Sequence, residues 1–100
     1  MTRQFEVYAN PSARSANFAP FVLVLQSHYI ELKSVVVAPL VTDKLPTSID
    51  IAVGIQGVTY VLALTELASI PASLLRRRVG DLTDREYDIR RALDRLFTGF

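Results

Sequence analysis

The sequence has no cysteine, which excludes disulfide bonds and metal sites built on thiolates. It also has no long hydrophobic run, because runs such as Val35–Val41 are far shorter than the roughly 20 residues that span a membrane. The first residues, MTRQF, lack the apolar segment of a secretory signal peptide. From these absences we expect a cytoplasmic protein that is not inserted in a membrane.

A large excess of either charge is also lacking, because 11 basic and 10 acidic residues give a net charge of +1. A dedicated nucleic-acid binder carries a strongly basic patch, so direct nucleic-acid binding is not expected. The charge is uneven, however, since residues 76–100 hold seven arginines, five acids and no lysine. Half of the 100 residues are hydrophobic, which suits one small folded domain over residues 1–100.

Alternating and β-branched segments predict strands over most of the first two thirds of the chain. They comprise residues 4–9, 21–27, 34–41 and a hairpin over 49–64 that turns at Gln56-Gly57. In the first strand, Phe5 and Val7 are expected to face inward and Tyr8 outward. Pro39 cannot donate to a β-ladder, so the third strand is expected to have an edge or a bulge there.

Two helical pieces are predicted after the strands. Residues 65–68 favour a single capped turn. A longer helix is predicted to start at a capping box of Thr83 and Glu86, with Leu82 packed on Tyr87 as a hydrophobic staple. Apolar residues then recur at spacings of three and four, at Ile89, Ala92, Leu93, Leu96, Phe97 and Phe100. Antiparallel strands followed by one helix predict an α+β, mostly β, domain with a barrel or strongly bent sheet.

Residues with catalytic chemistry are few. His28 is the only histidine and has no partner at metal-ligand spacing, so an exposed residue at a strand end is expected. The acids Glu31 and Asp50 are expected to be solvated charges rather than an acid–base pair. Residues 76–78 are three arginines that could contact phosphates, but a polar edge strand that resists aggregation is favoured. We therefore expect no catalytic residue, no metal and no cofactor.

The aromatic residues at the end of the predicted helix stand apart from this pattern. The last turn is expected to overhang the sheet, and it carries Phe97 and Phe100. Burying Phe100 would yield roughly 1.5–3 kcal/mol. That energy is available either to the protein's own core or to a partner, and composition leaves both open.

The order of motifs resembles the CcdB family of bacterial toxins over nearly the whole chain. The resemblance is carried by QFEVY at 4–8, FVLVLQS at 21–27, TELASIP at 65–71, DLTDREYDI at 81–89 and FTGF at 97–100. It implies an SH3-like barrel with a C-terminal helix and a homodimer. It also implies a cytoplasmic toxin without enzymatic activity that is neutralised by a cognate CcdA-like antitoxin.

The resemblance further implies that the protein poisons a topoisomerase by binding the A subunit of DNA gyrase. By position, it assigns target binding to seven residues: Tyr29, Ile30, Asp94, Phe97, Thr98, Gly99 and Phe100. Thr98 stands where the family has tryptophan, and Asp94 stands where asparagine is usual. Three alternatives therefore stay open: another target, reduced toxicity, or a ribonuclease toxin of the same barrel fold.

Overall fold

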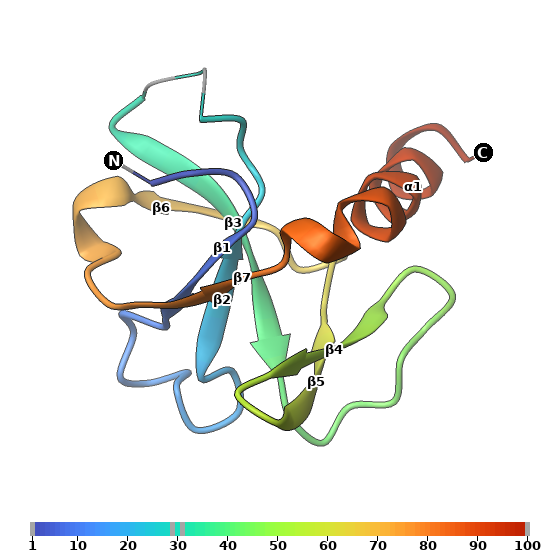
Figure 1. Cartoon of the computed structure of the whole chain (residues 1–100), viewed down its shortest axis with the longest axis horizontal. Helices are drawn as coiled ribbons and strands as arrows, with labels where there is room; N and C mark the ends of the chain where they lie inside the picture. The colour runs from blue at the N-terminus through green and yellow to red at the C-terminus, as the bar shows by residue number, and fades with distance from the viewer. Residues whose placement is uncertain (1, 29, 31, 100) are drawn as a thin grey trace.

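The computed structural model describes residues 2–28, 30 and 32–99, which form a curled antiparallel sheet and one α-helix (Figure 1). The strands are β1 (Glu6–Ala9), β2 (Phe21–Val24), β3 (Ser34–Val41), β4 (Ile51–Ile55), β5 (Val58–Leu62), β6 (Ala68–Pro71) and β7 (Arg78–Asp81). Two short 3-10 helices are η1 (Ala72–Leu74) and η2 (Thr83–Arg85), and helix α1 spans Glu86–Thr98. This half-barrel with a helix after it confirms the predicted α+β, mostly β, fold class.

The sheet order is β4-β5-β3-β2-β1-β7, and β6 pairs with β3 outside this path. On one side of β3, Ser34–Val37 pair with β6 and Leu40–Val41 pair with β5. Pro39 lies between these pairings, and its carbonyl accepts a hydrogen bond from the Ala63 N–H at 3.0 Å. A residue in an antiparallel strand directs its backbone nitrogen and its carbonyl toward the same neighbouring strand. Pro39 lacks an N–H, and it lies where β3 changes its pairing from β6 to β5. The predicted edge is therefore a local break in the hydrogen bonding of a central strand.

β1 begins at Glu6 rather than at residue 4, because Phe5 has a φ of 70°, outside the extended region. Phe5 and Val7 are buried in the main core, as predicted. Tyr8 is buried as well, in a second apolar cluster with Val22, so its predicted outward position is wrong. The sheet carries apolar clusters on both of its faces here, and simple in-and-out alternation does not describe β1.

Residues 65–68 do not form the predicted helical turn. The chain turns after Ala63, whose carbonyl accepts a hydrogen bond from Glu66 N–H at 3.1 Å. It then enters β6, which lies antiparallel to the first half of β3. Strand formation depends on the available partner more than on local preference. The free edge at Ser34–Val37 decides the structure of this segment.

The predicted capping box is also absent at the start of the helix. The N-caps are Leu82 for η2 and Arg85 for α1, and neither side chain makes a capping hydrogen bond. The carboxylate of Asp81 instead accepts a hydrogen bond from Thr83 N–H at 3.1 Å. The predicted staple is wrong too, because Leu82 is buried whereas Tyr87 is 70% exposed.

Helix α1 is buried at its start and exposed at its end. Ile89 and Ala92 belong to the main core, Leu93 and Leu96 are half-buried, and Phe97 is 69% exposed. Figure 1 shows α1 projecting away from the sheet, which confirms the predicted overhang. In the described part of the chain, no helix has the length and apolar character needed to cross a membrane.

Candidate functional site

The last turn of α1 is exposed and has a defined end. Gly99 is the C-cap with a φ of 81°, a left-handed conformation that glycine adopts without a steric penalty. Its N–H donates to the Arg95 carbonyl at 3.0 Å. The Thr98 hydroxyl donates to the Asp94 carbonyl at 2.6 Å, so this side chain bonds within the helix. We call Asp94, Phe97, Thr98 and Gly99 the helix tip; Phe100 lies outside the described residues.

Two aromatic side chains of α1 are largely exposed, and they differ in what surrounds them. The ring of Tyr87 lies under the Arg91 guanidinium, 5.6 Å from the ring centroid, and its hydroxyl accepts a hydrogen bond from Arg91. No ring or cation contact engages Phe97 among the described residues. The helix tip therefore offers an apolar ring for binding, and Asp94 is its one ionisable side chain.

The structure does not bring Ile30 to the helix tip. Ile30 is 56% exposed, and its N–H donates to the Ser27 carbonyl at 3.0 Å. Ile30 instead lines a small pocket with Gln26, Leu32 and Val35, and no described residue of α1 contributes to the lining of that pocket. Tyr29 lies outside the described residues. His28, expected to be exposed, is half-buried beside the Arg3 guanidinium at 3.1 Å.

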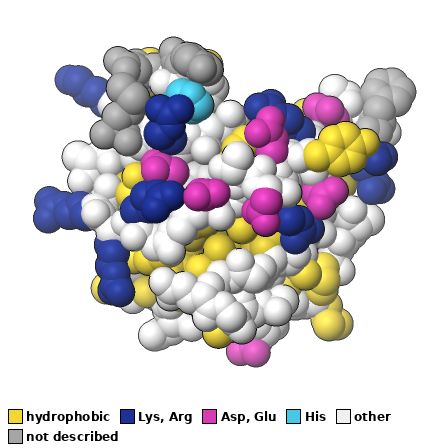
Figure 2. Space-filling view, viewed as in Figure 1, with side chains coloured by type: hydrophobic (Ala, Val, Ile, Leu, Met, Phe, Trp, Pro, Cys, Tyr) yellow, Lys and Arg dark blue, Asp and Glu magenta, His cyan; other side chains and the backbone are white. Residues whose placement is uncertain are grey.

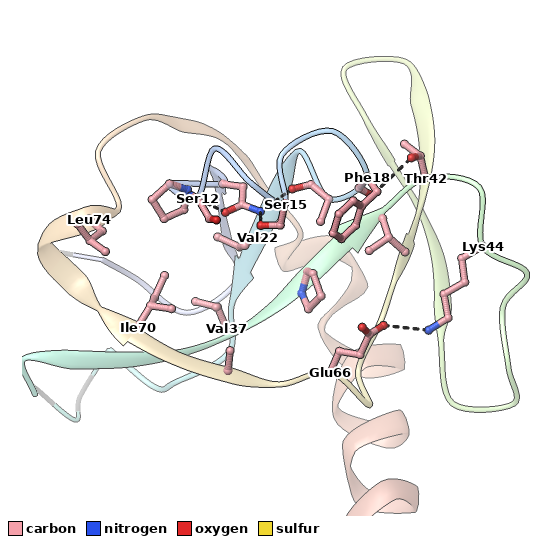
Figure 3. Close-up of a pocket in the computed structure, with 16 residues that line it drawn as sticks. Ser12, Ser15, Phe18, Val22, Val37, Thr42, Lys44, Glu66, Ile70 and Leu74 are labelled. Carbon is pink, nitrogen blue, oxygen red and sulfur yellow. Dashed lines mark hydrogen bonds and ion pairs between the residues drawn. The ribbon is translucent and has the colours of Figure 1, made fainter.

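A groove that the sequence did not indicate crosses the sheet (Figure 3). Its volume is about 540 Å³, within the range of ligand pockets. Side chains of β2, β3 and β6 form a mainly apolar surface, and the polar segment 10–15 forms the facing wall. Leu74 and Lys44 mark its two ends. We call this the sheet groove; its lining includes Asn10, Ser12, Ser15, Phe18, Val22, Val37, Pro39, Val41, Thr42, Ala68 and Ile70.

An ionic cluster closes one end of the sheet groove. The Lys44 ammonium lies 3.2 Å from the carboxylates of both Asp50 and Glu66. The Asp50 side chain is fully buried, so its predicted solvated position is wrong, and Glu31 lies outside the described residues. Sequence analysis missed the regular spacing of Lys44, Thr47 and Asp50, which lie three residues apart. Around a turn, that spacing brings the three side chains together. Thr47 N–H donates to the Asp50 carboxylate at 3.3 Å.

Hydrogen bonds within this cluster keep Asp50 and Lys44 charged near neutral pH. Burial raises the pKa of Asp50, but hydrogen bonds from Thr47 and Lys44 outweigh burial and hold that pKa below its ordinary value. Burial lowers the pKa of Lys44, but hydrogen bonds to Asp50 and Glu66 outweigh burial and raise it. Lys44 is therefore a poor proton donor near neutral pH. Within the described residues, no three His, Cys, Asp or Glu side chains gather into a metal site.

The arginines at 76–78 lie beside the last strand of the sheet. Arg78 belongs to β7, an edge strand, and it pairs with Glu6 at 2.8 Å and Asp81 at 3.2 Å. Arg76 and Arg77 are exposed just before this strand. The view in Figure 2 shows acidic side chains interleaved with basic ones across the middle of this face. The arrangement matches the favoured prediction of a charged edge strand.

Comparison with known proteins finds a matching family model and similar solved structures. A family model described as CcdB protein matches residues 4–99. The structure of the Mycobacterium tuberculosis toxin MazF-mt6 is similar, with a TM-score of 0.73 and 22% identity over 95% of this chain and 96% of that chain. An endoribonuclease from mycobacterial species also has a TM-score of 0.73, with 15% identity over 93% of this chain and 88% of that chain. At these identities, the two structures share the fold alone.

Proposed function

The chain belongs to the CcdB family, and from this premise we propose that it arrests growth by binding the A subunit of DNA gyrase through its helix tip. Membership of this family implies that the chain is the toxin of a toxin–antitoxin module. It also implies that the chain binds an antitoxin and forms a dimer. In the proposed mechanism the protein binds and traps its target and performs no catalysis. Two protomers would present two tips to the paired subunits of gyrase.

The exposed ring of Phe97 on the projecting turn carries this proposal. Phe97 is 69% exposed on a projecting turn, so a partner that covers its ring lowers the free energy of the complex. Full burial of such a side chain contributes roughly 1.5–3 kcal/mol. Gly99 adds a compact, left-handed end that lets the last turn approach a partner backbone closely.

A DNA cleavage assay with purified gyrase from the cognate host tests the target. We expect cleaved DNA to accumulate when the protein is added. Thr98 is exposed and stands where the family has tryptophan, so T98W should strengthen trapping, because tryptophan binds arginine by a cation–π contact of up to about 2 kcal/mol. Trapping by T98W alone would favour the reduced-toxicity alternative. Trapping by neither protein would contradict gyrase as the target.

We further propose that the sheet groove, on the other face of the sheet from α1, receives a segment of the antitoxin. The groove surface is mainly apolar, which suits apolar side chains of an extended or helical segment. At the closed end, Asp50 and Glu66 outnumber Lys44. Beyond the other end, the chain continues into the exposed Arg76 and Arg77. We expect a segment with a basic residue at the Glu66 end and an acidic residue at the opposite end.

Exposed groove residues allow a test that spares the core. Phe18, at the groove, and Leu45, outside it, are both exposed, at 58% and 89%. F18S and E66K should weaken binding of the cognate antitoxin, measured by calorimetry, whereas the control L45S should not. Growth arrest by F18S and E66K should stay at the level of the unaltered protein. Antitoxin affinity that is equal in all three variants would contradict the assignment of the groove.

The alternative function is a ribonuclease, and the shared fold of the mycobacterial endoribonuclease favours it. The described residues offer little support for acid–base catalysis. Arg78 is held by two carboxylates, and the raised pKa of Lys44 opposes proton transfer near neutral pH. Incubation of the purified protein in large excess with cellular RNA decides between the two functions. We expect intact RNA, and specific cleavage would favour the ribonuclease.

A further inference from the structure

We propose that Arg95 is a positioning residue that holds the helix tip in place by bonding α1 to the loop at residues 42–50. Its guanidinium Nη1 donates to the Ser48 carbonyl at 3.4 Å. Its own carbonyl accepts the Gly99 N–H at 3.0 Å. One residue thus connects the glycine cap of the tip to a loop some fifty positions earlier in the chain. The functional consequence rests on the proposed role of the tip, but the anchoring itself does not.

The last turn needs such an anchor because the core holds only the first part of α1. Ile89 and Ala92 are the buried side chains of the helix. Beyond them, Leu96 is half-buried and Phe97 is exposed. Helix ends fray where tertiary contacts are few, and local opening costs little free energy there. Apolar packing alone therefore leaves the direction of the tip weakly determined.

The loop that receives Arg95 is itself held firmly. Asp50, two residues after Ser48, has a fully buried side chain and pairs with Lys44. The Thr47 hydroxyl accepts hydrogen bonds from Ile49 N–H and Asp50 N–H, both at 3.3 Å. Ser48 lies inside this turn, so its carbonyl is a fixed acceptor. Figure 1 shows the loop rising beneath α1.

Two other arginines also connect this helical region to the rest of the protein, but at points farther from the helix tip than Arg95. Arg85 donates to the Ala52 carbonyl at 3.0 Å, at the start of the helix. Arg90 reaches Gln4 at 3.4 Å and lies over the Phe5 ring, near the middle. Arg95 is the basic residue of the last turn. The three contacts secure the helix at its start, middle and end, and the last one borders the tip.

Arg91 supplies a matched control, because it is exposed on the same helix and its guanidinium contacts Tyr87 rather than another element. We would measure amide hydrogen exchange in the full chain for R95M, R95K and R91M. R95M should speed exchange at Gly99 by about fivefold, the effect of losing one hydrogen bond, without changing exchange at Ile89. R95K should restore part of the protection, because lysine also donates to a carbonyl. R91M should match the unaltered protein.

The same variants connect the anchor to activity. R95M should lower growth arrest at a given expression level, R95K should restore part of it, and R91M should have no effect. Equal exchange at Gly99 in R95M and R91M would overturn the proposal. Faster exchange throughout R95M would also overturn it, because Arg95 would then act on global stability. If the unaltered protein fails to arrest growth, the proposed function fails, while hydrogen exchange at Gly99 still decides the anchoring role.

Discussion

The buried carboxylate of Asp50 accepts hydrogen bonds from Thr47 and has one cationic partner, Lys44. Removing one partner of a buried ion pair leaves an uncompensated charge, which costs about 3 kcal/mol or more. We expect K44M to lower the free energy of unfolding by about 3 kcal/mol, measured by urea denaturation. K33M is the control, because Lys33 is exposed. Equal stability of the two variants would show that the Lys44 cluster contributes little.

The same pair predicts how stability changes with pH. Asp50 has a lowered pKa in the folded protein, so its contribution is present above about pH 4 and is lost as pH falls through the folded pKa. Lys44 has a raised pKa, so its contribution is present below about pH 10.4 and is lost as pH rises through the folded pKa. The difference in the free energy of unfolding between K44M and the unaltered protein should therefore be largest between these two pH limits. It should become smaller at lower pH and at higher pH. A difference that is independent of pH would contradict this account.

Single residues were predicted well where local pattern decides their position. Periodicity correctly placed Ile89 in the core and Phe97 on an overhanging turn. It placed Tyr8 wrongly, because a cluster from other strands covers Tyr8, and Asp50, expected to be a solvated charge, is buried. A second apolar cluster covers Tyr8, and the turn at Thr47 buries Asp50. No alternation within either segment carries that information.

At the scale of elements, the turn between β4 and β5 combines a strong sequence signal with a strict backbone requirement. Gln56 and Gly57 have φ values of 51° and 81°, as a type I′ turn requires. We expect G57A to lower the free energy of unfolding by about 1–2 kcal/mol, because alanine is strained in the left-handed region. Thermal or urea unfolding would measure the loss.

Gly54 offers the matched control in the same hairpin. A Cβ added at either glycine meets no atom within 4 Å, but only Gly57 has a positive φ. G54A should leave stability unchanged or raise it by up to about 1 kcal/mol, by restricting the unfolded chain. A loss in G54A as large as that in G57A would show that backbone strain is not the cause.

Elements with local signals were predicted, whereas those that depend on distant partners were not. The hairpin, β2, β3 and the core face of α1 follow from alternation, turn residues and helical spacing. β6 was missed because its strand structure comes from the free edge of β3. Helical structure does begin at Thr83, but the capping residue was predicted wrongly, because the carboxylate of Asp81 rather than the side chain of Thr83 accepts the hydrogen bond there.

At the scale of the whole molecule, the structure separates two surfaces. α1 and the main core lie on one side of the sheet, and the sheet groove lies over the other apolar clusters. The groove could not be predicted, because its lining comes from segments between residue 10 and residue 74. The helix tip could be predicted, because it lies on one continuous stretch. Under the proposed roles of the helix tip and the sheet groove, this separation predicts that target binding and neutralisation can be altered independently.

The most direct test of a target-binding helix tip compares two aromatic residues of α1 that are equally exposed. Phe97 is 69% exposed in the last turn, and Tyr87 is 70% exposed in the first. We would induce F97A, Y87A and the unaltered protein at matched levels in a host without the antitoxin and measure growth. The account predicts that the unaltered protein and Y87A arrest growth, whereas F97A loses most of the effect. Growth arrest by F97A equal to that of the unaltered protein would contradict the account.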